Sequence, residues 1–352
     1  MNPLTRQKRI FLPSDLSRLF HIQKAILAIL VTFLFSPSLA GAAFSSDQPL
    51  KGPGGKDYLY EDVSTASYGL GDQRYFLFEP DDPKPETAPL IIFMHGHKAV
   101  NPRAYGAWIE HIVKKGNILV YPQYQSRTTP FHKYLPNAVQ AVLEAIDELE
   151  GGDHVRPDLD KCALVGHSLG GLLSANMAAV AEESGLPIPK AVMPVQPGLT
   201  HPLEDLTRIS PDTLLLTVVG DQDTHVRDKI AREIFWGTPQ IPFENKDFVI
   251  LRSEKYKFSS LTADHFAPCC RHLFAGVIPL FRTDALDFFC FWKLFEALTD
   301  AAFYGENREY ALGNTPQQRY MGIWEDGTPR KEMIITDNPE LKPEGNGRGR
   351  GY

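Results

Sequence analysis

The chain contains several short runs of consecutive apolar residues, and segments with helical periodicity lie between many of them. A strand with one exposed face alternates apolar and polar residues, whereas a strand covered on both faces is apolar throughout. The runs therefore predict a parallel sheet covered on both faces. They lie at residues 90–94, 118–121, 163–165, 191–195, 214–219 and 248–251.

Two further patterns complete the expected fold. Residues 57–63 and 73–79 alternate apolar and polar positions, which predicts an antiparallel hairpin ahead of the parallel strands. Strands that alternate with helices specify a doubly wound α/β fold with a mostly parallel sheet. Helices are expected at residues 104–115, 138–149, 169–183 and 284–303, and the last is apolar enough to pack on a face of the sheet.

These elements predict a single catalytic domain over residues 44–304. The polar residues 305–341 are expected to form a C-terminal extension packed on or beside that domain. Residues 342–352 are dominated by Gly and charged residues, and we expect them to be a disordered tail.

The N-terminus has the order of a secretory signal peptide. Residues 1–24 are basic, residues 25–35 are apolar, and small residues lead to a cleavage site near Ala42 or Ala43. An uncleaved anchor is the alternative, but 11 apolar residues fall short of the roughly 20 that span a bilayer. We therefore expect residues 1–43 to be removed and the protein to be periplasmic or extracellular, without a stable membrane span. Intact Met1 on the native protein would contradict this.

Charge and cysteine content narrow the classes of partner. The net charge is −7, and the basic residues of the first 43 positions leave the remainder more acidic still. Such a surface repels phosphate backbones, which excludes nucleic acid as the main partner.

Of the four cysteines, Cys162 lies in a predicted strand, and one bridge from Cys269 or Cys270 to Cys290 is plausible. No C-x-x-C pair exists, so a zinc site is not expected.

The most informative segment is Gly166-His167-Ser168-Leu169-Gly170-Gly171, between a predicted strand and a predicted helix. A serine on a tight strand-to-helix turn adopts a strained backbone and needs small residues two positions before and after it. Gly166 and Gly170 meet this demand, so Ser168 is the candidate nucleophile. A structural Gly-Ser turn is the alternative.

Serine at its free pKa is a poor nucleophile and needs a base and an orienting acid. The acid is expected after residues 214–219, where Asp221 and Asp223 are both candidates. We favour Asp223, because Gly220 lets the chain turn off the strand three residues earlier, and assign Asp221 to bracing the turn.

The base is expected on the next loop. His265 follows the strand at 248–251, and the rival His272 begins an apolar, helix-like run. We favour His265 and expect His272 to be a surface or packing residue.

The loop after residues 90–94 reads His95-Gly96-His97. Its glycine permits close approach of the backbone to a ligand. We expect the main-chain amides of His97 and Leu169 to form an oxyanion hole, with the His95 side chain holding the loop and the His97 side chain at the pocket mouth. His167 is interpreted as a packing residue.

These motifs (HG, GHSLGG, GDQD and DHFAP) resemble the α/β-hydrolase superfamily over residues 57–303. Within it they look like secreted bacterial esterases related to dienelactone hydrolases, chlorophyllase-like enzymes and polyester hydrolases. The resemblance implies a Ser168–His265–Asp223 triad, no metal and no organic cofactor. It departs after Gly305, where residues 312–329 have no counterpart in the minimal fold.

The sequence thus predicts a serine hydrolase that acts on a small-molecule or polymeric carboxylic ester. Aromatic residues near the predicted strand ends, among them Tyr105, Phe131 and Phe266, would suit an apolar substrate, although most fit core packing equally well. A peptidase or acyltransferase with the same three residues remains an alternative. A third interpretation is a non-catalytic binding protein on the same scaffold. It predicts the loss of a triad residue, whereas all three are present.

Overall fold

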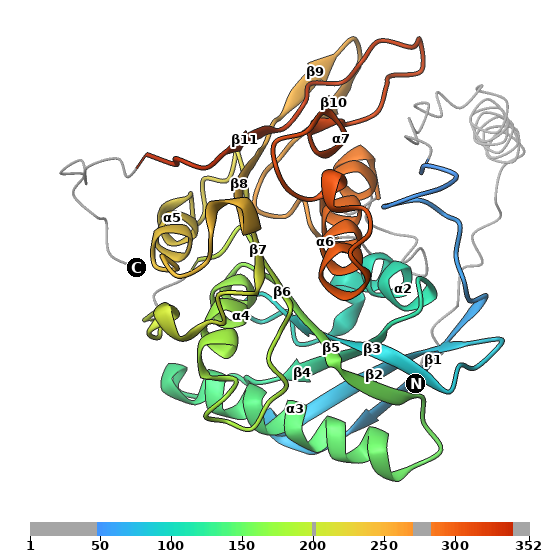
Figure 1. Cartoon of the computed structure of the whole chain (residues 1–352), viewed down its shortest axis with the longest axis vertical. Helices are drawn as coiled ribbons and strands as arrows, with labels where there is room; N and C mark the ends of the chain where they lie inside the picture. The colour runs from blue at the N-terminus through green and yellow to red at the C-terminus, as the bar shows by residue number, and fades with distance from the viewer. Residues whose placement is uncertain (1–47, 199–201, 270–282, 341–352) are drawn as a thin grey trace, which may run out of the picture. The chain divides into compact units, whose positions relative to one another are not determined.

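The computed structural model describes residues 48–198, 202–269 and 283–340. Within these residues nine strands form one sheet in the order β1-β2-β4-β3-β5-β6-β7-β8-β11, and β9 and β10 form a small separate hairpin (Figure 1). The strands are β1 (Asp62–Tyr68), β2 (Arg74–Asp81), β3 (Thr87–Met94), β4 (Ile118–Gln123), β5 (Arg156–His167), β6 (Ala191–Val195), β7 (Leu214–Gly220), β8 (Lys246–Leu251), β9 (Glu254–Tyr256), β10 (Ser259–Leu261) and β11 (Ile334–Thr336).

Helices connect and cover these strands. The α-helices are α2 (Gly106–Lys114), α3 (Tyr134–Gly151), α4 (Leu169–Val180), α5 (Lys229–Trp236), α6 (Lys293–Tyr304) and α7 (Pro316–Arg319), and a π-helical segment, Asp287–Trp292, leads into α6. Short 3-10 turns occur at Gly71–Gln73, Pro102–Tyr105, Phe131–Lys133, Leu206–Arg208, Phe243–Asn245 and Arg308–Tyr310.

The sheet is mostly parallel, as predicted. Strands β3 to β8 pair in parallel, whereas β2 is antiparallel to both β1 and β4. This order and direction, with helices on both faces, is an α/β-hydrolase-like fold.

The first predicted strand, residues 57–63, was placed too early. The ladder begins at Asp62, opposite Asp81, because the preceding residues bind elsewhere. The amides of Leu59 and Tyr60 both donate to the carbonyl of Lys114 at the end of α2, at 3.0 and 3.2 Å. This segment therefore follows the helix before the chain enters the sheet.

Alternate residues of the central strands face two separate apolar cores. On β3, Leu90 and Ile92 pack in the core that contains α3 and α4, whereas Ile91 and Phe93 pack in the core that contains α2 and α6. Because both faces are covered, these strands read as continuous apolar runs.

The predicted last core helix is present as the π-helical segment followed by α6. Phe291 and Phe295 pack against Trp108 of α2 with ring centroids 5.9 and 6.4 Å away. Both side chains are fully buried, so this helix closes one face of the sheet.

The chain after Gly305 adds to the sheet. β11 pairs antiparallel with β8 and forms an edge strand, while Met321 and Trp324 join the core around α6. The Lys293 ammonium group donates to the main-chain carbonyls of Gln317, Gln318 and Tyr320. The residues that precede β11 are thus held to α6 by burial and by main-chain acceptors.

The proposed disulfide is wrong. Cys290 is a fully buried free thiol among apolar residues, on the face of the helical segment that packs into the core, so neither Cys269 nor Cys270 bridges to it. Cys162 is likewise a buried free thiol. Cys270 itself lies outside the described residues.

Several expectations concern parts of the chain that the structure does not describe. The signal peptide at residues 1–43 and the tail at 342–352 both lie outside the described ranges. Among the residues that are described, no helix has the length and apolar character that crossing a bilayer requires.

Candidate active site

Ser168 lies on a sharp turn between β5 and α4. Its backbone has φ 58° and ψ −124°, a conformation that costs energy for any residue other than glycine. A Cβ on Gly170 would lie 2.0 Å from the carbonyl oxygen of Met94, and one on Gly166 would lie 2.2 Å from that of Gly170. A side chain at either position would therefore clash with main-chain atoms, and the close packing holds the serine in its strained conformation.

Three of the predicted site residues meet at this turn. The His265 imidazole lies with Nε2 2.9 Å from Ser168 Oγ and Nδ1 2.8 Å from Asp223 Oδ2. A carboxylate only accepts hydrogen bonds, so Nδ1 carries the proton and Nε2 is free to accept from the serine hydroxyl. The three residues are 3, 6 and 7% exposed for Ser168, Asp223 and His265, so this chain of hydrogen bonds is shielded from water.

The second oxygen of Asp223 is fixed by its own turn. Oδ1 accepts hydrogen bonds from the amides of His225 and Val226, at 3.0 and 3.1 Å. Burial by itself would raise the pKa of Asp223, but the hydrogen bond and charge of His265, together with these two amides, outweigh it and hold the pKa below its ordinary value. The carboxylate is therefore ionised and faces the imidazole.

Asp221 occupies a different position on the same turn. Its carboxylate accepts from the amide and the hydroxyl of Ser253, at 2.9 and 2.5 Å. The Ser253 hydroxyl in turn accepts from the amide of Ala263, at 2.9 Å. Asp221 thus ties the end of β7 to the loop that carries His265 and does not contact the imidazole.

Residues 262–269, which include His265, contain no helix or strand, yet their main chain is held at successive positions. The Gln222 amide donates to the carbonyl of Ala263 at 3.1 Å, and the Gln196 side chain donates to that of Asp264 at 2.6 Å. His167 Nε2 lies 2.8 Å from the carbonyl of His265. Hydrogen bonds from three different segments therefore fix the main chain around His265.

Gln196 and Ser253 were not identified from the sequence, and Tyr105 was named there only as an aromatic residue for substrate contact or core packing. Gln196 is fully buried with φ 45°, and the Tyr105 hydroxyl, also buried, lies 2.8 Å from His167 Nδ1. Their only signal is a long-range hydrogen bond, for which a single sequence has no pattern.

The loop His95-Gly96-His97 lies directly beside the serine. A Cβ on Gly96 would be 3.4 Å from the Cβ of Ser168 and 3.1 Å from the Tyr105 hydroxyl, which explains the need for glycine. The His95 imidazole donates from Nδ1 to the carbonyl of Gly96 at 2.7 Å, and its ring stacks on Tyr124 at 4.2 Å. Burial lowers the pKa of His95 to about 4, so its ring is neutral.

The two expected oxyanion donors are the main-chain amides of Leu169, which follows the serine, and of His97, which follows Gly96. Leu169 is the first residue of α4, where main-chain amides have no partner within the helix. Within the described residues, neither its amide nor that of His97 donates to another protein group. Each amide is therefore without a protein partner among the described residues, and the N-terminus of α4 adds positive potential beside Ser168.

The aromatic residues near the site divide into two groups. Tyr105 and Tyr124 are buried in the cores, whereas Phe131 and Phe266 are each 47% exposed. Phe131 stacks on His97, and Phe266 packs edge-on against His265. Only the second group is exposed enough to contact a substrate directly. The rival base His272 lies outside the described residues.

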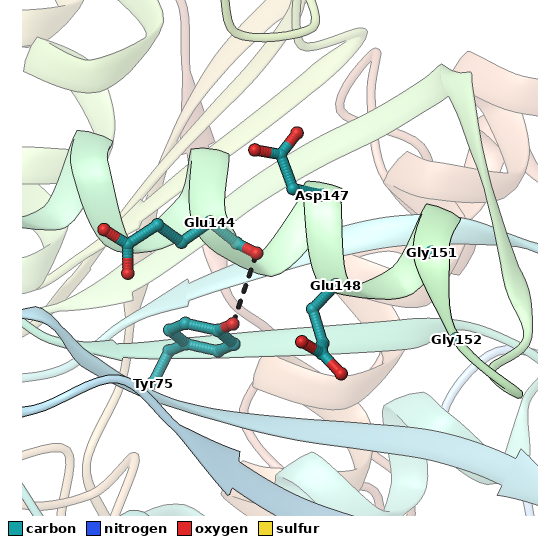
Figure 2. A pocket seen from close by; sticks show the side chains of 6 residues that line it. All are labelled: Tyr75, Glu144, Asp147, Glu148, Gly151 and Gly152. Atoms are coloured by element: carbon teal, nitrogen blue, oxygen red, sulfur yellow. Dashed lines mark hydrogen bonds between the residues drawn. The ribbon is translucent and has the colours of Figure 1, made fainter.

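A recess of about 460 Å³ lies elsewhere, between β2 and the end of α3 (Figure 2). The Tyr75 hydroxyl donates to the carbonyl of Glu144 inside it, at 3.2 Å, and burial raises the pKa of Tyr75 to about 12. The recess contains none of the predicted site residues and no candidate nucleophile. Its lining residues are Tyr75, Glu144, Asp147, Glu148, Gly151 and Gly152.

A metal site is not formed by the described part of the chain. Across the described ranges, no group of three or more His, Cys, Asp or Glu side chains is arranged to hold a metal ion.

Comparison with known proteins identifies part of the chain. Residues 74–214 match the model of the chlorophyllase family, and no curated protein matches the chain. The matched range covers less than half of the chain. It includes the turn with Ser168 and ends before Asp223 and His265. The match implies a hydrolase that acts on carboxylic esters.

Proposed function

We propose that this protein is a serine hydrolase that cleaves carboxylic esters through an acyl-enzyme intermediate. The observation that carries the proposal is the continuous hydrogen-bonded chain from Ser168 Oγ through the His265 imidazole to the Asp223 carboxylate. It starts at a serine with a strained backbone, and within the described residues the amides of Leu169 and His97 donate to no other protein group. A packing role for these three residues would not require strain at the serine or an ionised buried carboxylate.

In the proposed reaction, Ser168 Oγ attacks the ester carbonyl carbon as His265 Nε2 removes the hydroxyl proton. Asp223 stabilises the imidazolium through Nδ1, where it already accepts a hydrogen bond. The amides of His97 and Leu169 bind the oxyanion of the tetrahedral intermediate. The intermediate collapses as His265 transfers the proton to the leaving alcohol oxygen, and water then repeats the sequence on the acyl-enzyme.

Two considerations support esters as substrates. The chlorophyllase-family match over residues 74–214 implies ester hydrolysis. In addition, an alkoxide leaves the tetrahedral intermediate more readily than an amine and needs less assistance. The exposed rings of Phe131 and Phe266 offer contacts to an apolar acyl or alcohol group.

The sequence of residues 1–43 supports the further proposal that the protein is exported after cleavage near Ala42 or Ala43.

A fluorophosphonate probe tests the nucleophile, since it forms a covalent bond with an activated serine. The wild-type protein should gain the mass of one phosphonyl group and lose esterase activity, whereas Ser168→Ala should remain unlabelled. Labelling of the alanine variant at the same rate would contradict the proposal.

The two aspartates supply a matched pair for the acid. Asp223→Asn should lower kcat by roughly 10³–10⁴-fold, because the imidazole loses its ionised partner. Asp221→Asn, which changes the same functional group two residues away, should cost less than about tenfold. The opposite ranking would exchange their roles.

Parallel assays with ester, amide and acyl-acceptor substrates separate an esterase from a peptidase or an acyltransferase.

A further inference from the structure

We infer that His167 is a positioning residue that holds the main chain of His265 and joins it to the loop containing Gly96. The inference rests on the proposed function and assigns a role to a side chain that the sequence indicated only as packing.

The geometry links two loops through one imidazole. His167 Nε2 lies 2.8 Å from the carbonyl oxygen of His265, and Nδ1 lies 2.8 Å from the Tyr105 hydroxyl. That hydroxyl also accepts from the amide of Gly96, at 3.1 Å. A path of hydrogen bonds therefore runs from the loop beside Ser168, through Tyr105 and His167, to the backbone of His265.

The partners determine the tautomer of His167. A carbonyl oxygen only accepts, so Nε2 must carry the proton, and Nδ1 must then accept from the Tyr105 hydroxyl. Burial lowers the pKa of His167 to about 3, with the charge of His265 the next contribution. Burial also raises the pKa of Tyr105 well above its ordinary value. At neutral pH the ring is thus neutral and the phenol keeps its proton.

The contact acts on the main chain of His265 itself, whereas Gln222 and Gln196 hold the carbonyls of the two preceding residues. Asp223 and Ser168 fix the two ring nitrogens, but the ring position also depends on the backbone of a loop without helix or strand. Among the described residues, His167 is the donor to the His265 carbonyl itself. A shift of about 1 Å in a reacting group can lower a rate by the order of 100-fold, so this bond should affect kcat.

Two substitutions separate the halves of the bridge. His167→Gln places an amide NH₂ at the position of Nε2 and keeps the donor to His265, whereas His167→Asn places an oxygen at the position of Nδ1 and keeps the acceptor for Tyr105. We expect the glutamine variant to retain kcat within about threefold and the asparagine variant to lose roughly 10- to 100-fold in kcat, with KM nearly unchanged in both. Thermal midpoints and fluorophosphonate labelling rates are measured on the same samples.

A packing role predicts a different result. Both substitutions remove the ring, and asparagine removes one methylene more, so loss of packing would lower stability in both without a selective loss of kcat. Equal kcat for the two folded variants would overturn the inference. Ser168→Ala keeps the tests separate: an active alanine variant contradicts the proposed function, whereas an inactive one beside equal glutamine and asparagine variants contradicts only the role of His167.

Tyr105→Phe provides a second test if the asparagine variant does not fold. Without the phenol, Nδ1 loses its donor, the other tautomer becomes accessible and the bond to His265 is weakened. We expect about a tenfold loss of kcat in the wild-type background and less than threefold in the His167→Gln background, because an amide has no tautomers. Equal losses in the two backgrounds would contradict the coupling.

Discussion

The turn that carries Ser168 and the loop that carries His265 both lie at the carboxyl end of the sheet, but different interactions fix them. The turn is built locally: Gly166 and Gly170 pack on each other and on β3 at distances that exclude any side chain. The carbonyl of Ser168 accepts from the amides of Gly171 and Leu172 just after it. Most of these contacts lie within residues 166–172, and the others come from the neighbouring strands, where Val195 of β6 accepts from the amide of Ser168.

The loop at residues 262–269 contains no glycine, and its internal hydrogen bonds run from the amides of Phe266 and Ala267 to Asp264 and from that of Cys269 to Phe266. Its backbone is held by Ser253, Gln222, Gln196 and His167, which lie on four other segments. A close glycine contact also borders the loop, because a Cβ on Gly220 would lie 2.1 Å from the Ala263 carbonyl oxygen, and Gln196 has φ 45°. The position of the nucleophile therefore depends mainly on close packing in the sheet, whereas the position of the base depends mainly on hydrogen bonds from several distant segments. Changes to the turn should therefore damage the fold, and changes around the loop should damage activity first.

Gly170→Ala should have the largest effect. The added Cβ would lie 2.0 Å from the Met94 carbonyl oxygen, and both partners are main chain in a packed core. We expect a loss of about 3 kcal/mol or more in the free energy of unfolding in urea, at the upper end of overpacking effects, or no soluble protein.

Gly151→Ala is the matched control, since a Cβ at the end of α3 meets nothing within 4 Å. It should change the free energy of unfolding by less than about 1 kcal/mol, in favour of alanine. Similar destabilisation by the two substitutions would show that the turn is not locally constrained.

The same contrast explains what could be predicted from the sequence. The apolar run at residues 191–195 coincides with β6, and the motif around Ser168 identified its turn, because both signals are local. The three-residue strand β11 was missed, since Ile334–Thr336 is too short to show a period. The first strand was misplaced because contacts with α2 override its alternation. Tyr105, Gln196 and Ser253 act only through distant partners, which one sequence does not reveal.

Acid should weaken the link between the two regions at His167. Its pKa in the folded protein is about 3, against an ordinary value of 6.5. The unfolded chain therefore binds a proton before the folded one does, and stability falls as the pH drops from about 6.5 towards 3. From pH 7 to pH 4 this residue alone should account for on the order of 3 kcal/mol. Above pH 6.5 its contribution is constant.

The His167→Gln variant isolates this effect because glutamine does not titrate. Urea unfolding at pH 7, 5.5 and 4 should show a smaller decrease in unfolding free energy for the variant than for the wild type. His95, whose pKa burial lowers to about 4, remains in both proteins and contributes equally to both curves. Parallel curves would contradict a neutral, buried His167.

Ser253→Ala should have the smallest effect on stability and a selective effect on activity. The substitution removes the hydroxyl that donates to Asp221 and accepts from the amide of Ala263. Ala263 is fully buried, so its amide is left without this acceptor at a cost of about 1–2 kcal/mol. Because the loop gains freedom where the imidazole must be held, kcat should fall by about tenfold while KM changes little. Ser260→Ala, an exposed serine on the adjacent β10, should leave both kcat and the unfolding free energy within error. If Ser253→Ala lost stability without losing kcat, the loop would be part of the fold's local frame, like the turn at Ser168, and the contrast between the two regions would be wrong.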